Sequence, residues 1–398
     1  MRGVLHVVGA GIAGLACAVA AARSGVRVVL HEAAPQAGGR CRSFRDDDLD
    51  RLIDNGTHLV IGANRTALAF ADAIGGTEAM EAVDPALPFL DLETGERWSL
   101  AAGRLPAGIA ETVAALGVPW TGARETVAAR LGPARHYRRL WKPLCEAALN
   151  TAPEDASARL FGRVLRAALL AGADGLRPWL FPAGLSAAFA APALATLAVH
   201  GGRFQPRRRL LAVGDRTLVF GDGPLRLGRE DRAVLALPPW ALVDILPGFP
   251  LPATRAIVNV HFRMEHGMAG LRLLGLVGGT AQWAFPRGDL LSATASAADR
   301  LAEEPAEAIA ARMWLDLSRA FDLNGPMPRF RVLKERRATM AHTPDGVARR
   351  PGHRTGADWL FLAGDWLASP WPCTIEAAAS SGLAAARLAV GRRDISFA

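Results

Sequence analysis

The N-terminal segment carries the pattern that most restricts how this chain can fold. An apolar, strand-like run over Val4–Val8 leads into Gly9-Ala10-Gly11-Ile12-Ala13-Gly14, and a helix of small residues follows over 15–23. A second apolar run over 26–30 precedes the acidic residue Glu32. Strand, glycine turn, helix, strand and acid in this order form the βαβ unit that binds dinucleotides. The sequence therefore predicts a parallel sheet with a phosphate-binding turn after its first strand.

Each residue of the glycine turn has a separate physical role. Gly9 permits the tight turn, Gly11 lets the backbone approach the pyrophosphate, and Gly14 allows the helix to pack closely on the strand. Ile12 and Ala13 open the helix, whose N-terminus directs unpaired N–H groups and a partial positive charge at the phosphates. We therefore expect these five residues to contact the cofactor.

Glu32 and the residues after it narrow the choice of dinucleotide. Glu32 stands eighteen residues after Gly14, where its carboxylate would accept hydrogen bonds from both ribose hydroxyls and repel a 2′-phosphate. This argues against NADP. The following turn contains Gly38, Gly39 and Arg40 and would present the arginine toward the pyrophosphate, so Gly39 and Arg40 are expected contacts. The alternative is a surface loop with an incidental arginine.

A second phosphate-binding device near the C-terminus distinguishes FAD from NAD. An apolar run over 359–363 ends in Gly364-Asp365-Trp366, and Thr374-Ile375-Glu376 opens an alanine-rich helix soon afterwards. This is again a strand, a glycine turn and a helix N-terminus. NAD needs no contact some 350 residues downstream of its fingerprint, whereas FAD-binding folds close over their long cofactor in this way. The two devices together favour FAD.

The segment Asp54-Asn55-Gly56-Thr57-His58 reads as a turn between strands. Gly56, flanked by polar groups, would let the backbone approach an isoalloxazine ring closely. Asp54 and His58 would form a carboxylate–imidazole pair near the flavin, positioned for proton transfer. The alternative is an Asx-type turn with a hydrogen-bonded histidine.

Composition argues against several other classes of protein. Of the 46 basic residues only Lys142 and Lys334 are lysines, so the net charge of +8 reflects an arginine excess typical of a GC-rich genome. The longest basic run, Arg207–Arg209, has no interleaved aromatic residues, and nucleic-acid binding is not expected. The four cysteines form no CxxC pair and have no ligand-like histidine spacing, which predicts neither a disulfide framework nor a metal site.

The passage Pro178–Gly202 carries no Asp, Glu, Lys or Arg and is long enough to span a bilayer. Three prolines interrupt it and alanine supplies much of it, so a buried helix pair or cavity wall is the preferred interpretation. The alternatives are a transmembrane helix and a surface that rests on anionic lipid. Because a strand-like run begins almost at once, no signal peptide is expected, and we predict a cytoplasmic protein, peripheral on the membrane's inner face in the lipid-resting case.

The remaining pattern predicts two interleaved domains of class α/β. Strand-like runs recur from about 234 onward, the helical periodicity of 303–321 is clear, and 82–200 looks mostly helical. We expect a Rossmann-type FAD-binding domain interleaved with an α+β substrate domain of mixed or antiparallel sheet and helices. The expected FAD-binding segments are 1–81, 200–246 and 340–398, and the expected substrate-domain segments are 82–199 and 247–339.

With these motifs in view, the chain resembles the FAD-dependent superfamily of monoamine oxidases, phytoene desaturases and protoporphyrinogen oxidases. Within it, the chain is most similar to the bacterial hydroxysqualene dehydroxylases, also called squalene-associated FAD-dependent desaturases, over nearly its full length. Thr57 departs from that family, in which glutamine is usual. The segments that carry the resemblance are Gly38-Gly39-Arg40, Asp54-Asn55-Gly56-Thr57-His58, the Trp283 strand, Arg337-Ala338-Thr339, Ala363-Gly364-Asp365-Trp366 and Trp371-Pro372-Cys373-Thr374-Ile375-Glu376.

The resemblance implies a non-covalent FAD, because Cys373 is not at the position where some relatives attach flavin. Asp365 would meet the ribityl or pyrophosphate region, and Thr374 and Ile375 would lie beside the flavin ring. The implied FAD contacts are Gly9, Gly11, Gly14, Glu32, Arg40, Gly56, Gly364, Asp365, Thr374 and Ile375.

The resemblance also implies a reaction: hydride from reduced flavin would replace the hydroxyl of hydroxysqualene, an apolar triterpenoid, to give squalene. Trp283, Phe285, Trp366 and Trp371 would wall an apolar pocket for it, or else be ordinary core aromatics. The electron donor is unknown, since the sequence contains no second GxGxxG. Alternatives are a carotenoid-type desaturase, an amine oxidase, or a flavin-binding protein without redox chemistry.

Overall fold

The cofactor-side sheet forms where the N-terminal pattern predicts it. The computed structural model describes residues 3–101, 122–268 and 270–397. In it, five parallel strands lie in the order β10-β2-β1-β14-β20, so the first strand is central and the C-terminal strand lies at one edge. This confirms the Rossmann-type half of the fold. The strands are β1 (Val4–Val8), β2 (Arg27–His31), β10 (Arg203–Gln205), β14 (Arg232–Leu235) and β20 (Leu360–Leu362).

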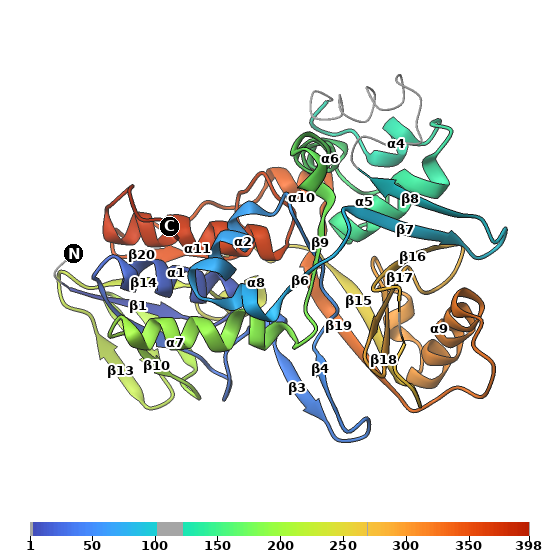
Figure 1. The fold of residues 1–398 in the computed structure, drawn as a ribbon. Helices are drawn as coiled ribbons and strands as arrows, with labels where there is room; N and C mark the ends of the chain where they lie inside the picture. Colours follow the sequence, from blue (N-terminus) through green and yellow to red (C-terminus); the bar gives the residue numbers. More distant parts are fainter. Residues whose placement is uncertain (1–2, 102–121, 269, 398) are drawn as a thin grey trace.

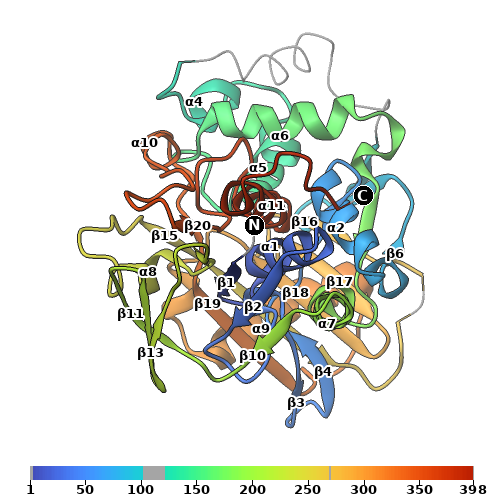
Figure 2. The same ribbon diagram turned by 90° about the vertical axis from the view of Figure 1, so that its left-hand side faces the viewer.

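Helices rich in alanine pack closely on this sheet. Helix α1 (Ile12–Arg23) is buried from Ile12 to Ala22 and lies against α11 (Ile375–Val390), as Figures 1 and 2 both show. A Cβ at Gly382 would lie 2.2 Å from the carbonyl oxygen of Ala13, so the two helices approach as closely as glycine allows. The first and last parts of the chain therefore build one core.

The second large sheet lies in segments from which we expect the substrate domain to form. Its seven strands lie in the order β19-β15-β18-β17-β16-β7-β8, antiparallel except for the parallel pair β16–β7. Helix α9 (Ala306–Phe321) shares a hydrophobic core with this sheet and lies beside it in Figure 1. The strands are β7 (Ala86–Asp91), β8 (Arg97–Ala101), β15 (Thr254–Arg263), β16 (Leu274–Val277), β17 (Trp283–Arg287), β18 (Leu290–Ala295) and β19 (Phe330–Met340).

The expectation that 82–200 is mostly helical needs correction. Strands β7 and β8 lie inside it and extend the seven-stranded sheet, because β7 pairs with the distant strand β16. A helical period over a short window cannot reveal a pairing partner almost two hundred residues away. Helices do fill much of the described remainder: α4 (Val127–Leu131), α5 (Lys142–Leu149), α6 (Ala158–Leu170) and α7 (Ala191–Val199).

The passage Pro178–Gly202 is largely buried in its first half, whereas only Ala193 and Leu197 are buried in its second half. It forms β9 (Pro178–Leu180), a π-helical turn over Ser186–Ala190, and α7, which packs on α1 although the expected boundary assigns it to the substrate domain. Val199 is its one large apolar side chain that is exposed. Among the helices that the structure describes, none has the length and hydrophobicity needed to cross a bilayer.

Smaller elements connect the two halves. The hairpin of β3 and β4 extends away from both large sheets in Figure 1, and β4 ends at Asp54, where the Asp54–His58 segment begins. Further elements are β3 (Ser43–Asp46), β4 (Arg51–Asp54), β5 (Val60–Ile61), β6 (Glu81–Ala82), β11 (Leu210–Gly214), β12 (Thr217–Phe220), β13 (Gly223–Arg226), α2 (Arg65–Ala73), α8 (Pro239–Leu242), α10 (Pro344–Ala348) and short 3₁₀ turns at Gly39–Cys41, Gly76–Ala79, Ala173–Leu176 and Leu301–Glu303 and a π-helical turn over Tyr137–Trp141.

Candidate active site

The glycine turn between β1 and α1 has the geometry expected of a phosphate cradle. Gly9 has a φ of +102°, a conformation that L side chains rarely adopt. A Cβ at Gly14 would lie 1.8 Å from the carbonyl oxygen of Gly9, so strand and helix touch there. At Gly11 a Cβ would meet no atom within 4 Å. The space beside Gly11 is therefore open, as a bound pyrophosphate requires.

Glu32 is held over this turn by backbone donors. Its Oε2 accepts a hydrogen bond from the Ala10 N–H at 2.7 Å, and its Oε1 accepts one from the Ala34 N–H at 2.8 Å. Each carboxylate oxygen has a second lone pair available to a ribose hydroxyl. The placement fits the role that the sequence predicts for Glu32.

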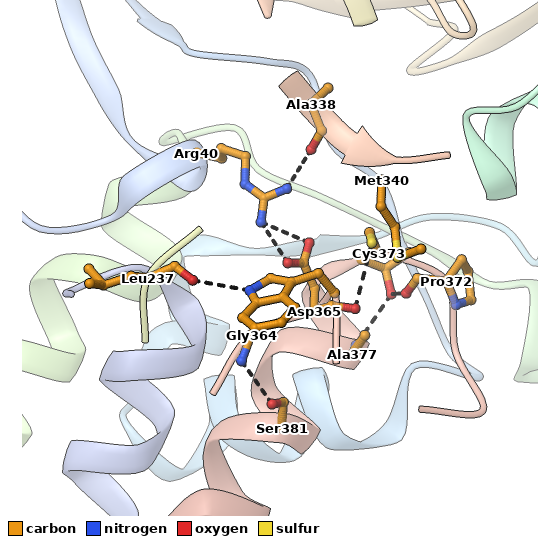
Figure 3. A network of polar contacts seen from close by, with 12 residues as sticks. Arg40, Leu237, Ala338, Met340, Gly364, Asp365, Pro372, Cys373, Ala377 and Ser381 are labelled. Carbon is orange, nitrogen blue, oxygen red and sulfur yellow. Dashed lines mark hydrogen bonds and ion pairs between the residues drawn. The ribbon is translucent and has the colours of Figure 1, made fainter. Parts of the chain in front are cut away.

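Arg40 joins the N-terminal and C-terminal cofactor segments. Its Nη2 donates to both carboxylate oxygens of Asp365 at 2.8 Å, and its Nη1 donates to the Ala338 carbonyl (Figure 3). Burial opposes the charge on Arg40, but the ion pair and hydrogen bonds with Asp365 outweigh it, so the pKa of Arg40 is raised. The guanidinium therefore stays charged, and it ties together two loops that lie 325 residues apart.

The C-terminal loop is organised around the start of α11. Thr374 caps the helix, because its hydroxyl accepts a hydrogen bond from the Ala377 N–H at 3.3 Å. Gly364 donates its N–H to Ser381 Oγ at 2.9 Å, and the Cys373 thiol lies 3.6 Å from the Asp365 carbonyl oxygen (Figure 3). The loop therefore presents a helix N-terminus next to the Arg40–Asp365 pair, as a site for an anionic cofactor needs.

Asp54 and His58 lie near each other, but within the described residues no hydrogen bond joins them. Asp54 is buried and accepts hydrogen bonds from the Ser43 hydroxyl at 2.6 Å, the Leu185 N–H at 2.9 Å and Arg287 Nη1 at 2.9 Å. Burial lowers the pKa of His58 to about 4, since the opposing charge of Asp54 compensates only in part. His58 is therefore neutral near pH 7, and its relation to Asp54 is electrostatic.

A cavity between the two halves is lined by polar side chains of the Asp54–His58 segment and of the seven-stranded sheet. One part of its wall is polar, and the other is apolar and comes from β9, the loop after it and β17. The lining residues are Asp54, Thr57, His58, Leu180, Phe181, Pro182, His261, Arg272, Phe285, Pro286, Arg287 and Ser292. The cavity therefore places apolar and polar side chains next to each other.

Reasoning from the sequence missed four of the polar lining residues, His261, Arg272, Arg287 and Ser292. His261 and Ser292 face each other across β15 and β18, and Arg287 ends β17. The available signal was weak: His261 and Asn259 are polar residues within the mainly apolar run 256–262, and a histidine in such a strand is more often a satisfied core residue than a ligand. Only the pairing of β15 with β18, which the sequence pattern does not specify, brings His261 and Ser292 together at the cavity.

The four aromatic residues expected to wall one pocket do not lie together. Phe285 lines the cavity, and Trp283 packs behind it against Phe89, with ring centroids 5.3 Å apart. Trp366 is buried, donates its indole N–H to the Leu237 carbonyl at 3.0 Å and lines a second, smaller cavity beside Arg40. Trp371 lines neither cavity. Of the four aromatic residues, only Phe285 lines the larger cavity. Trp366 instead packs in a hydrophobic cluster next to the loop that follows β20.

Comparison with family models defines the class of protein. Residues 7–74 match the NAD(P)-binding Rossmann-like domain, and residues 90–390 match the flavin containing amine oxidoreductases. With the fold and the two phosphate-binding segments described above, these matches make the chain an FAD-dependent oxidoreductase. The open turn at Gly11 and the helix N-terminus at Thr374 fit that cofactor.

Comparison with individual proteins narrows the class. A hydroxysqualene dehydroxylase of Sinorhizobium fredii is 40% identical, covering 98% of this chain and 99% of its own, and one of Rhodopseudomonas palustris is 39% identical, covering 98% and 100%. The chain belongs to the hydroxysqualene dehydroxylase family. Cyclohexylamine oxidase of Brevibacterium oxydans has a similar fold, with a TM-score of 0.73, 19% identity, and coverage of 98% of this chain and 99% of its own.

Proposed function

We propose that the protein reductively removes the hydroxyl of hydroxysqualene to give squalene. The observation that carries the proposal is the cavity with one apolar and one polar wall, lined by residues of the Asp54–His58 segment. A triterpenoid alcohol has matching chemistry, a long apolar chain with a single hydroxyl. The relatives that share 40% and 39% of their residues with this chain are named for that reaction.

The reaction sets what the chain must supply. Replacing C–OH by C–H consumes one hydride and one proton and releases water. Bound FAD in its reduced form supplies the hydride. The polypeptide must bind the apolar chain, exclude bulk water and bring a proton to the departing hydroxyl. Leu180, Phe181 and Phe285 serve the first two purposes, because their side chains form the apolar wall of the cavity.

We assign the proton donor to His58, with Asp54 as its electrostatic partner. His58 lines the polar part of the cavity, and the negative charge of Asp54 favours the imidazolium form. Asp54 is itself fixed by Ser43, Leu185 and Arg287, so its charge stays in place while the imidazole gains and loses a proton. The donor thus combines a mobile proton with a fixed countercharge.

An anaerobic single turnover tests the function. The FAD-loaded protein is reduced, mixed with hydroxysqualene and followed by flavin absorbance while the product is extracted. Reoxidation of the flavin with formation of squalene is the expected result. A flavin that stays reduced would remove the substrate assignment and leave the FAD site intact. Peroxide release with amines in air would favour an amine oxidase instead.

A further inference from the structure

His261 is the most unusual polar residue of the cavity. It lies on β15, is 1% exposed, and its Nδ1 is 2.7 Å from the hydroxyl oxygen of Ser292, its register partner on β18. Its other nitrogen, Nε2, is buried and makes no hydrogen bond of normal geometry within the described residues, although the Asp54 backbone lies close enough to the ring to oppose the lowering of its pKa. Both residues line the cavity.

An unpaired buried nitrogen is costly in a folded protein, since its partner in water has been lost and not replaced. Burial also keeps the imidazole of His261 neutral by lowering its pKa to about 4, with Arg287 acting in the same direction and Asp54 opposing. A neutral imidazole whose Nδ1 is engaged by a hydroxyl can either donate or accept at Nε2. A hydroxyl group can likewise do either, so it is a suitable partner.

We propose that His261, oriented by Ser292, binds the hydroxyl of the substrate in the cavity. This rests on the function proposed above, whose substrate carries one hydroxyl on an apolar chain. The hydrogen bond holds the oxygen of the scissile C–O bond at the polar wall, beside His58. His261 itself neither gains nor loses a proton in the reaction. The product lacks the hydroxyl and leaves Nε2 unpaired again, so the site binds the product less tightly than the substrate.

Equilibrium binding to the oxidised, FAD-loaded protein tests the proposal, because no turnover occurs without reductant. The probes are hydroxysqualene and squalene in the same detergent micelles, and the readout is the ratio of their dissociation constants from the flavin absorbance change. Wild type should prefer hydroxysqualene. H261F should lower that preference about threefold to tenfold, the value of one hydrogen bond, and leave the affinity for squalene within about twofold.

Two further variants guard against a folding defect, which FAD content and thermal unfolding would reveal. H261Q retains a side-chain N–H and should keep part of the preference. S292A frees the imidazole and should reduce the preference less than H261F does. If H261F does not fold, unchanged ratios in both of these variants overturn the proposal.

H353F is the matched control. His353 is half-buried, its Nε2 lies 3.3 Å from the Ser381 hydroxyl, and it does not line the cavity, so the preference should stay at the wild-type value. If wild type converts hydroxysqualene but H261F prefers hydroxysqualene over squalene as strongly as wild type does, the role of His261 is overturned and the proposed function stands. Wild type that neither prefers nor converts hydroxysqualene would overturn the proposed function instead.

Discussion

Two histidines of the cavity are neutral for the same reason and differ in what surrounds them. Burial lowers the pKa of both His58 and His261 to about 4. At His58 the largest charge effect comes from Asp54 and opposes burial, whereas at His261 it comes from Arg287 and adds to burial, and Nδ1 lies beside the Ser292 hydroxyl. The same side chain can therefore serve as a proton carrier at one position and as a neutral hydrogen-bonding group at the other.

Replacement of His58 tests the first of these roles. H58Q should keep FAD and lower the rate of flavin reoxidation by hydroxysqualene about 100-fold to 10,000-fold, the usual contribution of a positioned acid. Because the donor must be protonated and its pKa is about 4, the wild-type rate should fall as pH rises from 5 to 8. Stopped-flow absorbance measures both effects. A variant with full rate and an unchanged pH profile would contradict the assignment.

Two glycines of the first turn make opposite predictions. G14A should lose stability by about 1–3 kcal/mol, because its Cβ would overlap the Gly9 carbonyl. G11A should unfold at the wild-type temperature when FAD is absent, since its Cβ meets no protein atom, yet should bind FAD more weakly. Thermal unfolding of the apoprotein and FAD titration separate the two. If G11A and wild type bound FAD with equal affinity, the open space beside Gly11 would not be part of the FAD site.

Among the elements, the Arg40–Asp365 pair connects the 3₁₀ turn after β2 to the loop after β20. D365N should lower the free energy of unfolding by about 1–3 kcal/mol, because Arg40 loses its charged partner. The FAD affinity should fall as well. Arg40 is 36% exposed at its side chain, so water compensates part of the loss. A double-mutant cycle with R40M measures the coupling, and a coupling energy of zero would contradict a structural role for the pair.

An element could be predicted from the sequence when the residues that determine it lie close together in the chain. The strands β1 and β2, the helix α1, and the C-terminal pair β20 and α11 follow from glycine spacing and apolar runs within a few dozen residues. The strands β7 and β8 were missed because they owe their conformation to β16. The same limit applied to the site: Glu32 and Arg40 belong to local motifs, whereas His261 and Ser292 acquire meaning only when β15 pairs with β18.

For the molecule as a whole, buried histidines predict sensitivity to acid. Burial lowers the pKa of His31 and His342 to about 3 and that of His261 to about 4, against 6.5 in the unfolded chain. The unfolded state therefore binds more protons, so the stabilisation is complete above pH 6.5 and declines as pH falls toward 4. Each histidine contributes up to about 1.4 kcal/mol per pH unit. Urea unfolding between pH 7.5 and 5 measures the slope.

His342 offers a specific check on that slope. Its Nδ1 donates to the Leu149 carbonyl and its Nε2 accepts from the Cys373 N–H at 2.9 Å, two bonds that only the neutral ring can make together. H342Q has a donor and an acceptor but no titration in this range, so its stability should depend less on pH than that of wild type. A slope equal to that of wild type would exclude His342 as a source of the acid sensitivity.

The packing of α11 on α1 also determines when the protein can become functional during its synthesis. Helix α1 leaves the ribosome early, with its glycine turn already in sequence, but the helix that covers it is translated more than three hundred residues later. Until then one apolar side of α1 has no native partner, and Asp365 is not yet present to meet Arg40. The nascent chain must therefore wait until α11 has been synthesised before it can enclose FAD.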